Sequence, residues 1–178
     1  MFKGTYHHRI DAKGRLPVPA AFRRSLGDES QVVVTLLDQC LAAYSPGEWA
    51  RLEAQLAALP AFSKPVKALT RLLASRAADC EIDVQGRILL PPSLRQAAGL
   101  GRDAVVVGVL NRFEVWSPEG WDIFVRESER LLDDVSLDIQ WPLPASTPTG
   151  PIPGSQPSPI SPPRAPSQGS DPQAKPNG

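Results

Sequence analysis

The sequence predicts an α+β fold made of two copies of one small unit, followed by a segment without a folded core. Three observations support this prediction. The chain matches itself without a gap at an offset of 72 residues, and each copy has the pattern of short strands, tight turns and capped helices. The composition of the last 37 residues offers almost no apolar surface to bury. The folding part is then residues 1–141, about the size of one domain.

The self-match involves residues with specific structural roles. Asp11-Ala-Lys-Gly-Arg15 falls on Asp83-Val-Gln-Gly-Arg87, and Tyr44-Ser-Pro-Gly-Glu-Trp49 falls on Trp116-Ser-Pro-Glu-Gly-Trp121. Pro19, Arg23 and Gly27 fall on Pro91, Arg95 and Gly99, which brings the identities at these anchor positions to nine. Two copies are too few for a solenoid, so we interpret them as a pseudo-dimer fused into one chain.

Each unit is predicted to begin with a short strand, a tight turn and a return strand. The strands are Thr5–Ile10 and Arg15–Val18 in the first unit, and Ala78–Ile82 and Arg87–Leu90 in the second. Asp can accept hydrogen bonds from its own backbone in a turn, and Gly adopts a positive φ without steric cost. The residues expected to structure the turns are Asp11, Gly14, Asp83 and Gly86.

Each return strand leads into a short helix that a proline opens and a glycine ends. These helices are predicted at 19–26 and 91–98, and this placement of Pro and Gly is typical of helix ends. Two apolar strands follow in each unit, near 31–37 and 40–44, and near 104–110 and 112–116.

A longer helix with a clear start closes each unit. Ser45 suits the N-cap, and Glu48 three residues later completes a capping box. Tyr44 and Trp49 have the spacing of a hydrophobic staple, and we expect Trp49 and its counterpart Trp121 in the core.

A further helix is predicted between the units. It opens near Ser63 and places Val66, Leu69, Leu73 and Ala77 on one face. The predicted organisation is a first repeat at 5–51, an inter-repeat helical segment at 52–76, a second repeat at 77–123, the end of the C-terminal helix at 124–141, and a disordered Pro-rich tail at 142–178.

Composition excludes several classes of protein. In residues 142–178, 22 of 37 positions are Pro, Gly or Ser, and such a segment cannot offset its ordering entropy. No run of about 18 apolar residues exists, so no transmembrane helix or membrane partner is expected. Cys40 and Cys80 do not make a disulfide framework, which favours a reducing cytoplasm.

Neither metal chemistry nor catalysis is indicated. His7 and His8 are neighbours on a predicted strand, so they point to opposite faces and cannot readily share one metal. Both cysteines lie in or beside apolar segments and are expected to be structural. We find no catalytic constellation, and so predict no enzyme activity, no cofactor and no small-molecule substrate.

The repeated Asp-x-x-x-Arg turn admits two interpretations. The arginine can reach back to the aspartate and stabilise the turn, or it can present a guanidinium to phosphate or a base edge. The structural interpretation carries more weight for Arg87, and the functional one for Arg15. The reason is charge. Lys13, Arg9, Arg23 and Arg24 surround the first turn in the sequence, whereas the second has Gln85 at its tip, Glu81 before it and Arg95-Gln96 after it.

These residues resemble the bacterial MraZ family of transcriptional regulators. The resemblance spans about residues 1–141 and rests on Met1-Phe-Lys-Gly, the two Asp-x-x-Gly-Arg turns with Pro19 and Pro91, and Asn111-Arg112-Phe113-Glu114. It implies two tandem swapped hairpins of the AbrB/SpoVT type that form a β-barrel-like pseudo-dimer with flanking helices. It also implies ring-like homo-oligomers.

The resemblance further implies a sequence-specific regulator without enzymatic activity. Its partner would be double-stranded DNA at short direct repeats, in the promoter of the division and cell-wall gene cluster containing its own gene. That partner would place the protein in the cytoplasm at the nucleoid. The candidate DNA-binding residues are Arg15, Lys13, Arg9, Arg23, Arg24 and Arg87, of which Arg15 and Arg87 come from the family motif and the others from charge.

An alternative stays open at this point. The chain could be an oligomeric protein-interaction module that does not bind DNA. Its Trp-bearing helices and the Pro-rich tail would then be the working surfaces. Pro159-Ile-Ser-Pro162 fits the PxxP pattern of polyproline-binding domains, although any Pro-rich tail yields such matches.

Overall fold

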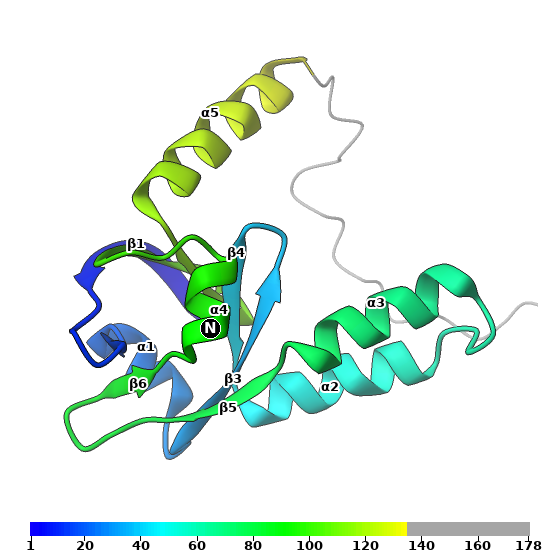
Figure 1. Cartoon of the computed structure of the whole chain (residues 1–178), viewed down its shortest axis with the longest axis horizontal. Coiled ribbons are helices and arrows are strands. Elements are labelled where there is room, and N and C mark those ends of the chain that lie inside the picture. Colours follow the sequence, from blue (N-terminus) through cyan, green and yellow to red (C-terminus); the bar gives the residue numbers. More distant parts are fainter. Residues whose placement is uncertain (135–178) are drawn as a thin grey trace, which may run out of the picture. The chain divides into compact units, whose positions relative to one another are not determined.

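The computed structural model describes residues 1–134, so the tail predicted at 142–178 lies outside the described residues. The elements follow the order β1 (Phe2–Arg9), β2 (Arg15–Pro17), α1 (Ala20–Leu26), β3 (Gln31–Leu37), β4 (Cys40–Tyr44), α2 (Pro46–Ala57), α3 (Lys64–Ser75), β5 (Ala78–Glu81), β6 (Arg87–Leu89), α4 (Pro92–Ala97), β7 (Asp103–Leu110), β8 (Arg112–Trp116) and α5 (Pro118–Asp134). The α+β class and the doubled order of elements are confirmed (Figure 1).

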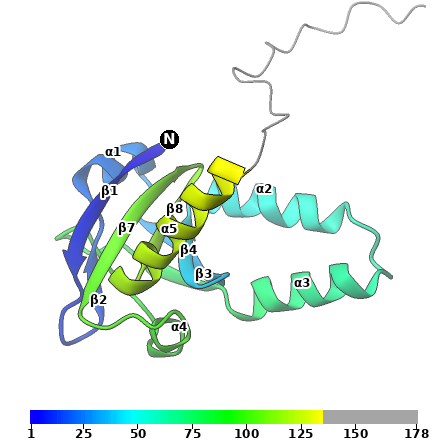
Figure 2. The same cartoon turned by 90° about the horizontal axis from the view of Figure 1, so that it is seen from above.

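The two repeats exchange their first strands. Six strands form one antiparallel sheet in the order β1-β7-β8-β4-β3-β5, and β2 pairs with β6 in a two-stranded sheet. Strand β1 of the first repeat therefore lies along β7 of the second, as Figure 2 shows. Strand β5 of the second repeat lies along β3 of the first. The return strands β2 and β6 also pair across the repeats, so the hairpins are swapped.

The pairing register shows a pseudo-two-fold axis. His7 faces Val105, and the residues 72 positions away, Asp79 and Val33, also face each other. Two positions face their own counterparts, Leu16 with Ile88 and Ala42 with Glu114. A residue can face its counterpart only where a two-fold axis passes between them, so the chain is a pseudo-dimer.

The core lies between the exchanged elements. Leu16 and Ile88 are fully buried on the axis. The Phe2 ring packs edge-on against Phe22 and Phe113, with centroids 5.4 and 5.5 Å apart. This packing explains why β1 begins at Phe2, three residues before the predicted start at Thr5.

Helices α2 and α5 start where expected, but only part of the capping box predicted for α2 is formed. The Ser45 hydroxyl accepts a hydrogen bond from the Glu48 N–H at 3.3 Å. The Glu48 carboxylate bonds Arg51 and Asn111 instead of returning to the cap, so the box is half formed. The Ser117 hydroxyl caps α5 in the same way, through the N–H of Gly120.

The two staples form, although their tryptophans are not core residues. The Trp49 ring lies 5.9 Å from Tyr44, and the Trp121 ring lies 5.8 Å from Trp116. Trp49 and Trp121 are half-buried, whereas Trp116 is buried. Neither tryptophan is buried as expected, although Trp121 packs against a buried cluster that includes Val105 and Trp116.

Helices α2 and α3 form a hairpin that leaves the sheet, and they lie side by side in Figures 1 and 2. The buried hydroxyl of Thr35 donates to the Leu73 carbonyl at 3.0 Å, which anchors the end of α3 on β3. Leu73 is buried, but Leu69 on the predicted apolar face is 44% exposed. Among residues 1–134, no helix combines the length and the apolar character needed to span a membrane.

Candidate nucleic-acid interface

The first turn is closed by the side chain of Asp11. One of its carboxylate oxygens accepts from the backbone N–H groups of Lys13 and Arg15 at 2.9 and 3.0 Å. The other accepts from the Arg15 Nε at 2.6 Å. Gly14 adopts φ 86°, a conformation that disfavours any side chain. The hydrogen bond from the Arg15 backbone N–H is the main cause that holds the pKa of Asp11 below its usual range. The Arg15 guanidinium and the Lys13 N–H lower this pKa further.

The second turn repeats this arrangement. Asp83 accepts from the N–H groups of Gln85 and Arg87 at 2.9 and 3.0 Å, and from the Arg87 Nε at 2.9 Å. Gly86 adopts φ 75°. The Arg87 guanidinium is the main reason that the pKa of Asp83 lies below its usual value. The expected turn-structuring role therefore holds for Asp and Gly in both copies.

The swap brings the two turns together. The Val18 N–H donates to the Gly86 carbonyl at 2.9 Å, and the Leu90 N–H donates to the Gly14 carbonyl at 3.0 Å. These bonds continue the pairing of β2 with β6 into both turns. One surface therefore presents two Asp-Arg turns that are 72 residues apart in sequence. We call the surface formed by residues 11–15 and 83–87 the turn face.

The two arginines of the turn face are held differently. Arg15 bonds Asp11 through Nε, and no hydrogen bond to its terminal nitrogens is found among the described residues. Arg87 bonds Asp83 through both Nε and Nη2, and its Nη1 lies 3.8 Å from the Asp11 carboxylate. Its side chain is 21% exposed, compared with 33% for Arg15. Arg87 thus ties the two turns together, whereas the donors at the tip of Arg15 remain available.

The helix arginines cross between the repeats. The position of a Cβ on Gly86 would lie 2.6 Å from the Arg23 guanidinium, and one on Gly14 would lie 3.0 Å from the Arg95 guanidinium. Arg23 therefore covers the second turn, although it follows the first turn in the sequence. The expectation that Arg23 joins the first turn is corrected, because the hairpin swap exchanges the helices that cover the turns. Any side chain at Gly14 or Gly86 would displace these guanidinium groups.

The first turn nevertheless has the more basic surroundings. A surface hollow is lined by Arg9, Asp11, Arg95 and Arg102. Arg9 pairs with Asp103 at 3.1 Å, and both side chains are largely exposed. Sequence reasoning did not assign Arg95 and Arg102 to this turn. The signal that could have found them is the repeat itself, since exchange of hairpins brings the helix of one repeat onto the turn of the other.

Two other candidate cations are exposed. Lys13 lies at the tip of the first turn, and Arg24 lies in the last turn of α1. Neither side chain forms an ion pair with another described residue. The second turn has the uncharged Gln85 at its tip, and Glu81 and Asp83 share one hollow with Arg87 and Arg15. Even with Arg23 over it, the second turn has less basic surroundings than the first.

The histidines and cysteines show no sign of metal binding or of a reactive thiol. His7 is exposed and His8 is half-buried, as strand alternation predicts, and burial lowers the pKa of His8. Burial raises the pKa of the Cys80 thiol to about 11 and raises that of Cys40 as well. Both thiols are therefore protonated and unreactive near neutral pH. In the described part of the chain, no group of three or more His, Cys, Asp or Glu side chains could hold a metal.

Comparisons with known proteins agree with the doubled architecture. The model of a family described as "MraZ protein, putative antitoxin-like" matches the chain twice, at residues 1–72 and 73–136. The boundary between the two matches falls at the offset of the internal repeat.

Three bacterial relatives carry the name transcriptional regulator MraZ. The protein of Ligilactobacillus salivarius is 52% identical over 136 residues, which is 76% of this chain and 94% of the relative. Those of Desulforamulus reducens and Natranaerobius thermophilus are 45% and 42% identical over 139 residues, which is 78% of this chain and 97% and 96% of the relatives. With a doubled family match and these identities, the chain belongs to the MraZ family.

Proposed function

We propose that this protein is a transcriptional regulator that binds double-stranded promoter DNA through its turn face. The observation that supports it best is the Arg15 guanidinium, which Asp11 holds through Nε and whose terminal nitrogens have no hydrogen-bond partner among the described residues. Asp11 itself lines the basic hollow of the first turn. An arginine whose Nε is held already has part of its side chain ordered, so binding costs less conformational entropy. Its terminal nitrogens can then bond guanine or phosphate bidentately.

The surrounding cations would position the protein on the DNA and would not read the base sequence. Lys13, Arg9, Arg95 and Arg102 would contact phosphates and fix the register of the turn on the duplex. Arg24 and Arg23 would extend the contact on the side of α1. Because the second turn is less basic than the first and Arg87 is paired with two aspartates, the second turn would mainly support the first.

The proposed target is the one that the family resemblance implies. The DNA would carry short direct repeats, in the promoter of the division and cell-wall gene cluster containing its own gene. A single turn face is small, so one chain should bind weakly. A ring-like homo-oligomer would place several turn faces along tandem repeats and gain affinity by effective concentration. Its place would be at the nucleoid in the cytoplasm, without a membrane partner, a cofactor or enzymatic activity.

A mobility-shift titration of the chain's own promoter region tests this proposal. We expect binding that is specific for DNA with intact repeats over scrambled repeats, and that weakens steeply with salt. The matched variants are Arg15→Ala and Arg51→Ala, because Arg51 is an exposed arginine on α2 and is not part of the turn face. Equal binding to scrambled DNA, or equal loss from both variants, would contradict the proposal. Absence of any DNA binding would favour a protein-interaction module.

A further inference from the structure

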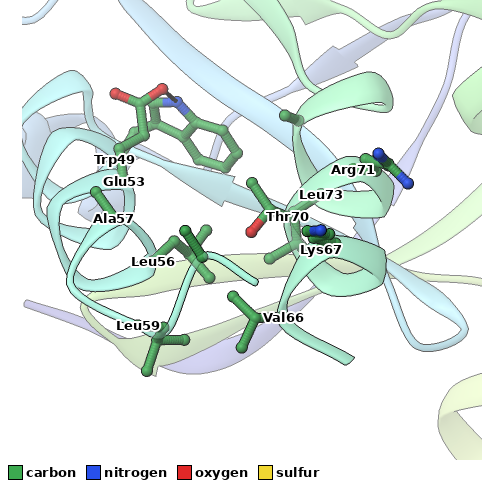
Figure 3. Close-up of a pocket in the computed structure, with 12 residues that line it drawn as sticks. Trp49, Glu53, Leu56, Ala57, Leu59, Val66, Lys67, Thr70, Arg71 and Leu73 are labelled. Atoms are coloured by element: carbon green, nitrogen blue, oxygen red, sulfur yellow. Dashed lines mark hydrogen bonds between the residues drawn. The ribbon is translucent and has the colours of Figure 1, made fainter. Parts of the chain in front are cut away.

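One exposed apolar side chain of the chain lies on the turn face and has no role in the fold. Most large apolar side chains that residues 1–134 expose lie on α3, on α5 or on the connection between α2 and α3. Leu59, beside the groove between α2 and α3 in Figure 3, is one of these. Val84 lies instead at the tip of the second turn, and its exposure of 104% is the highest of any large apolar residue in the described part of the chain.

The structure of the turn does not require a valine at this position. The Gly86 N–H donates to the Asp83 carbonyl at 2.8 Å, so Val84 and Gln85 are the central residues of a tight turn. Valine suits strands and buried positions, whereas Gly, Pro, Asn, Asp and Ser are the usual residues of turns. Asp83 already holds the backbone of this turn through the N–H groups of Gln85 and Arg87. The two tip side chains therefore remain available for a contact outside the chain.

The two tips of the turn face carry different chemistry. Ala12 and Lys13 occupy the first tip, and Val84 and Gln85 occupy the same positions in the second. The Lys13 ammonium suits a phosphate, whereas a branched apolar side chain beside an uncharged amide does not. Gln85 is exposed, and no hydrogen bond from its side chain to another described residue is found. The second tip thus suits an uncharged partner group.

The charged groups near the second turn lie outside its tip. They are Glu81 and Asp83 against Arg15, Arg87 and Arg23. Arg87 is paired with Asp83, and Arg23 lies over Gly86. A phosphate contact of this turn would therefore come from these arginines, and the tip residues would contact something else.

An A·T base pair offers matching groups in the major groove. Its thymine exposes a C5-methyl group, and its adenine exposes the N7 acceptor and the N6 amino donor. An apolar side chain can contact the methyl group, and a glutamine amide can bond N6 and N7 together. The groove is about 12 Å wide and admits a two-stranded β-ribbon. Strands β2 and β6, which carry the two turns, form such a ribbon.

We infer that the second tip recognises A·T pairs in the major groove of the bound DNA, with Val84 against a thymine methyl group and Gln85 on an adenine. Consecutive Cα atoms lie about 3.8 Å apart, close to the rise of about 3.4 Å per base pair. The two contacts therefore fall on the same base pair or on successive ones. The inference rests on the proposed function and adds a second point of base recognition to that of Arg15.

The second tip depends on the first turn for its position on the DNA. A methyl contact alone can form with any thymine, so it does not distinguish intact repeats from scrambled repeats of the same composition. Arg15 would fix the register, and the bonds from Val18 to Gly86 and from Leu90 to Gly14 hold the second turn at a set place beside the first. Loss of the Val84 contact should therefore weaken binding less than loss of Arg15.

Base analogues test the two contacts without changing the base sequence. Deoxyuridine in place of thymidine removes the C5-methyl group, and 7-deazaadenine in place of adenine removes the N7 acceptor. One analogue is placed at one position of every repeat, position by position, in the chain's own promoter region. The Kd of the full chain is measured for each DNA by mobility-shift titration at one salt concentration.

Three variants accompany the wild type. Val84→Ala gives the second tip the apolar side chain of the first, and Gln85→Ala removes the amide. Leu110→Ala is the matched control, because it removes an exposed apolar side chain at the end of β7, which is not part of the turn face. All three positions are exposed, so the variants should keep the melting temperature of the wild type, and thermal melts check this.

The expected response is confined to one place in the repeat. At one thymine, loss of the methyl group should weaken the wild type and Leu110→Ala by about 4-fold per contact, as expected for one buried methyl group. Val84→Ala should bind both DNAs equally. At an adenine of the same or the next base pair, 7-deazaadenine should weaken the wild type by about 3- to 10-fold, since one of two bonds is lost. Gln85→Ala should not respond to this analogue.

Other results would overturn the inference. A wild type that binds the promoter and responds to deoxyuridine at no position has no thymine contact of this kind. A Val84→Ala protein that responds as the wild type does would show that another residue contacts the methyl group. Responses to the two analogues at widely separated base pairs would exclude a common origin in one tip. Each of these results leaves the proposed function in place, whereas a wild type that binds no DNA would refute both.

Discussion

The two turns share their internal hydrogen bonds and differ in their surroundings. Asp11 and Asp83 accept bonds from matching donors, so the fold requires both turns equally. Arg15 uses one nitrogen for its aspartate, whereas Arg87 uses all three and reaches both aspartates. The comparison teaches that one motif can serve structure in both copies and remain available for binding in one.

The largest expected effect comes from removing Arg15. Arg15→Ala should weaken specific DNA binding by about 10- to 100-fold per contacting subunit, because a bidentate base contact contributes about 1–3 kcal/mol. Arg87→Ala should weaken binding less and lower the melting temperature more, since it releases both turns. Mobility shifts and thermal melts of both variants provide the measurement. Equal losses of DNA affinity from Arg15→Ala and Arg87→Ala would show that the two turns have equal roles in binding.

The crossing of the helix arginines gives the next largest effect. Arg95→Ala should reduce DNA affinity more than Arg23→Ala, because Arg95 lies over the first turn and Arg23 over the second. Each lost phosphate contact lowers the salt dependence of binding. The sequence neighbourhood predicts the opposite order. DNA titrations of both variants at several salt concentrations distinguish the two orders. A larger loss of affinity from Arg23→Ala would contradict the expectation that Arg95 is the arginine that assists the first turn.

The contribution of the two turn aspartates to the free energy of unfolding should depend on pH. The folded-state pKa values of Asp11 and Asp83 lie below their ordinary values, so each ionised carboxylate stabilises the fold at neutral pH. That contribution is lost as the pH falls below the ordinary aspartate range and through the lowered pKa. The stability gap between wild type and Asp83→Asn should therefore shrink on acidification. A gap that does not change with pH would show that the carboxylate charge is unimportant.

The smallest effect concerns the tip of the first turn. Lys13→Gln should lower the slope of log K against log salt by about 0.9 if one phosphate contact is lost. Sequence preference should hardly change, because phosphate contacts position the protein without reading bases. Gln85→Lys is the matched change at the second tip, and it should raise the slope less because Glu81 and Asp83 lie nearby. Equal and opposite changes would indicate two equivalent tips.

Much of the fold was predictable because its signals are local. The turn chemistry of Asp11 and Gly14, the Ser45 cap and the Tyr44–Trp49 staple each depend on residues within four or five positions. The half-formed capping box was not predictable, because Asn111 is distant in sequence and competes for Glu48.

The arrangement of the site depends on long-range pairing. The distribution of charge along the sequence placed Arg23 beside the first turn. In the structure Arg23 lies over the second turn, because the repeats exchange β1 and β5. Arg95 and Arg102 were missed for the same reason. The basic character of the first turn was still predicted, because its own residues Lys13 and Arg9 contribute to it.

The central claim is that the turn face binds DNA chiefly through the first turn. The most direct measurement is the salt-dependent affinity of the full chain for its own promoter region, for wild type, Arg15→Ala and Arg87→Ala side by side. We expect Arg15→Ala to lose the preference for intact over scrambled repeats, while Arg87→Ala keeps that preference with reduced affinity. An Arg15→Ala protein that is folded and still discriminates between the two DNAs would contradict the claim.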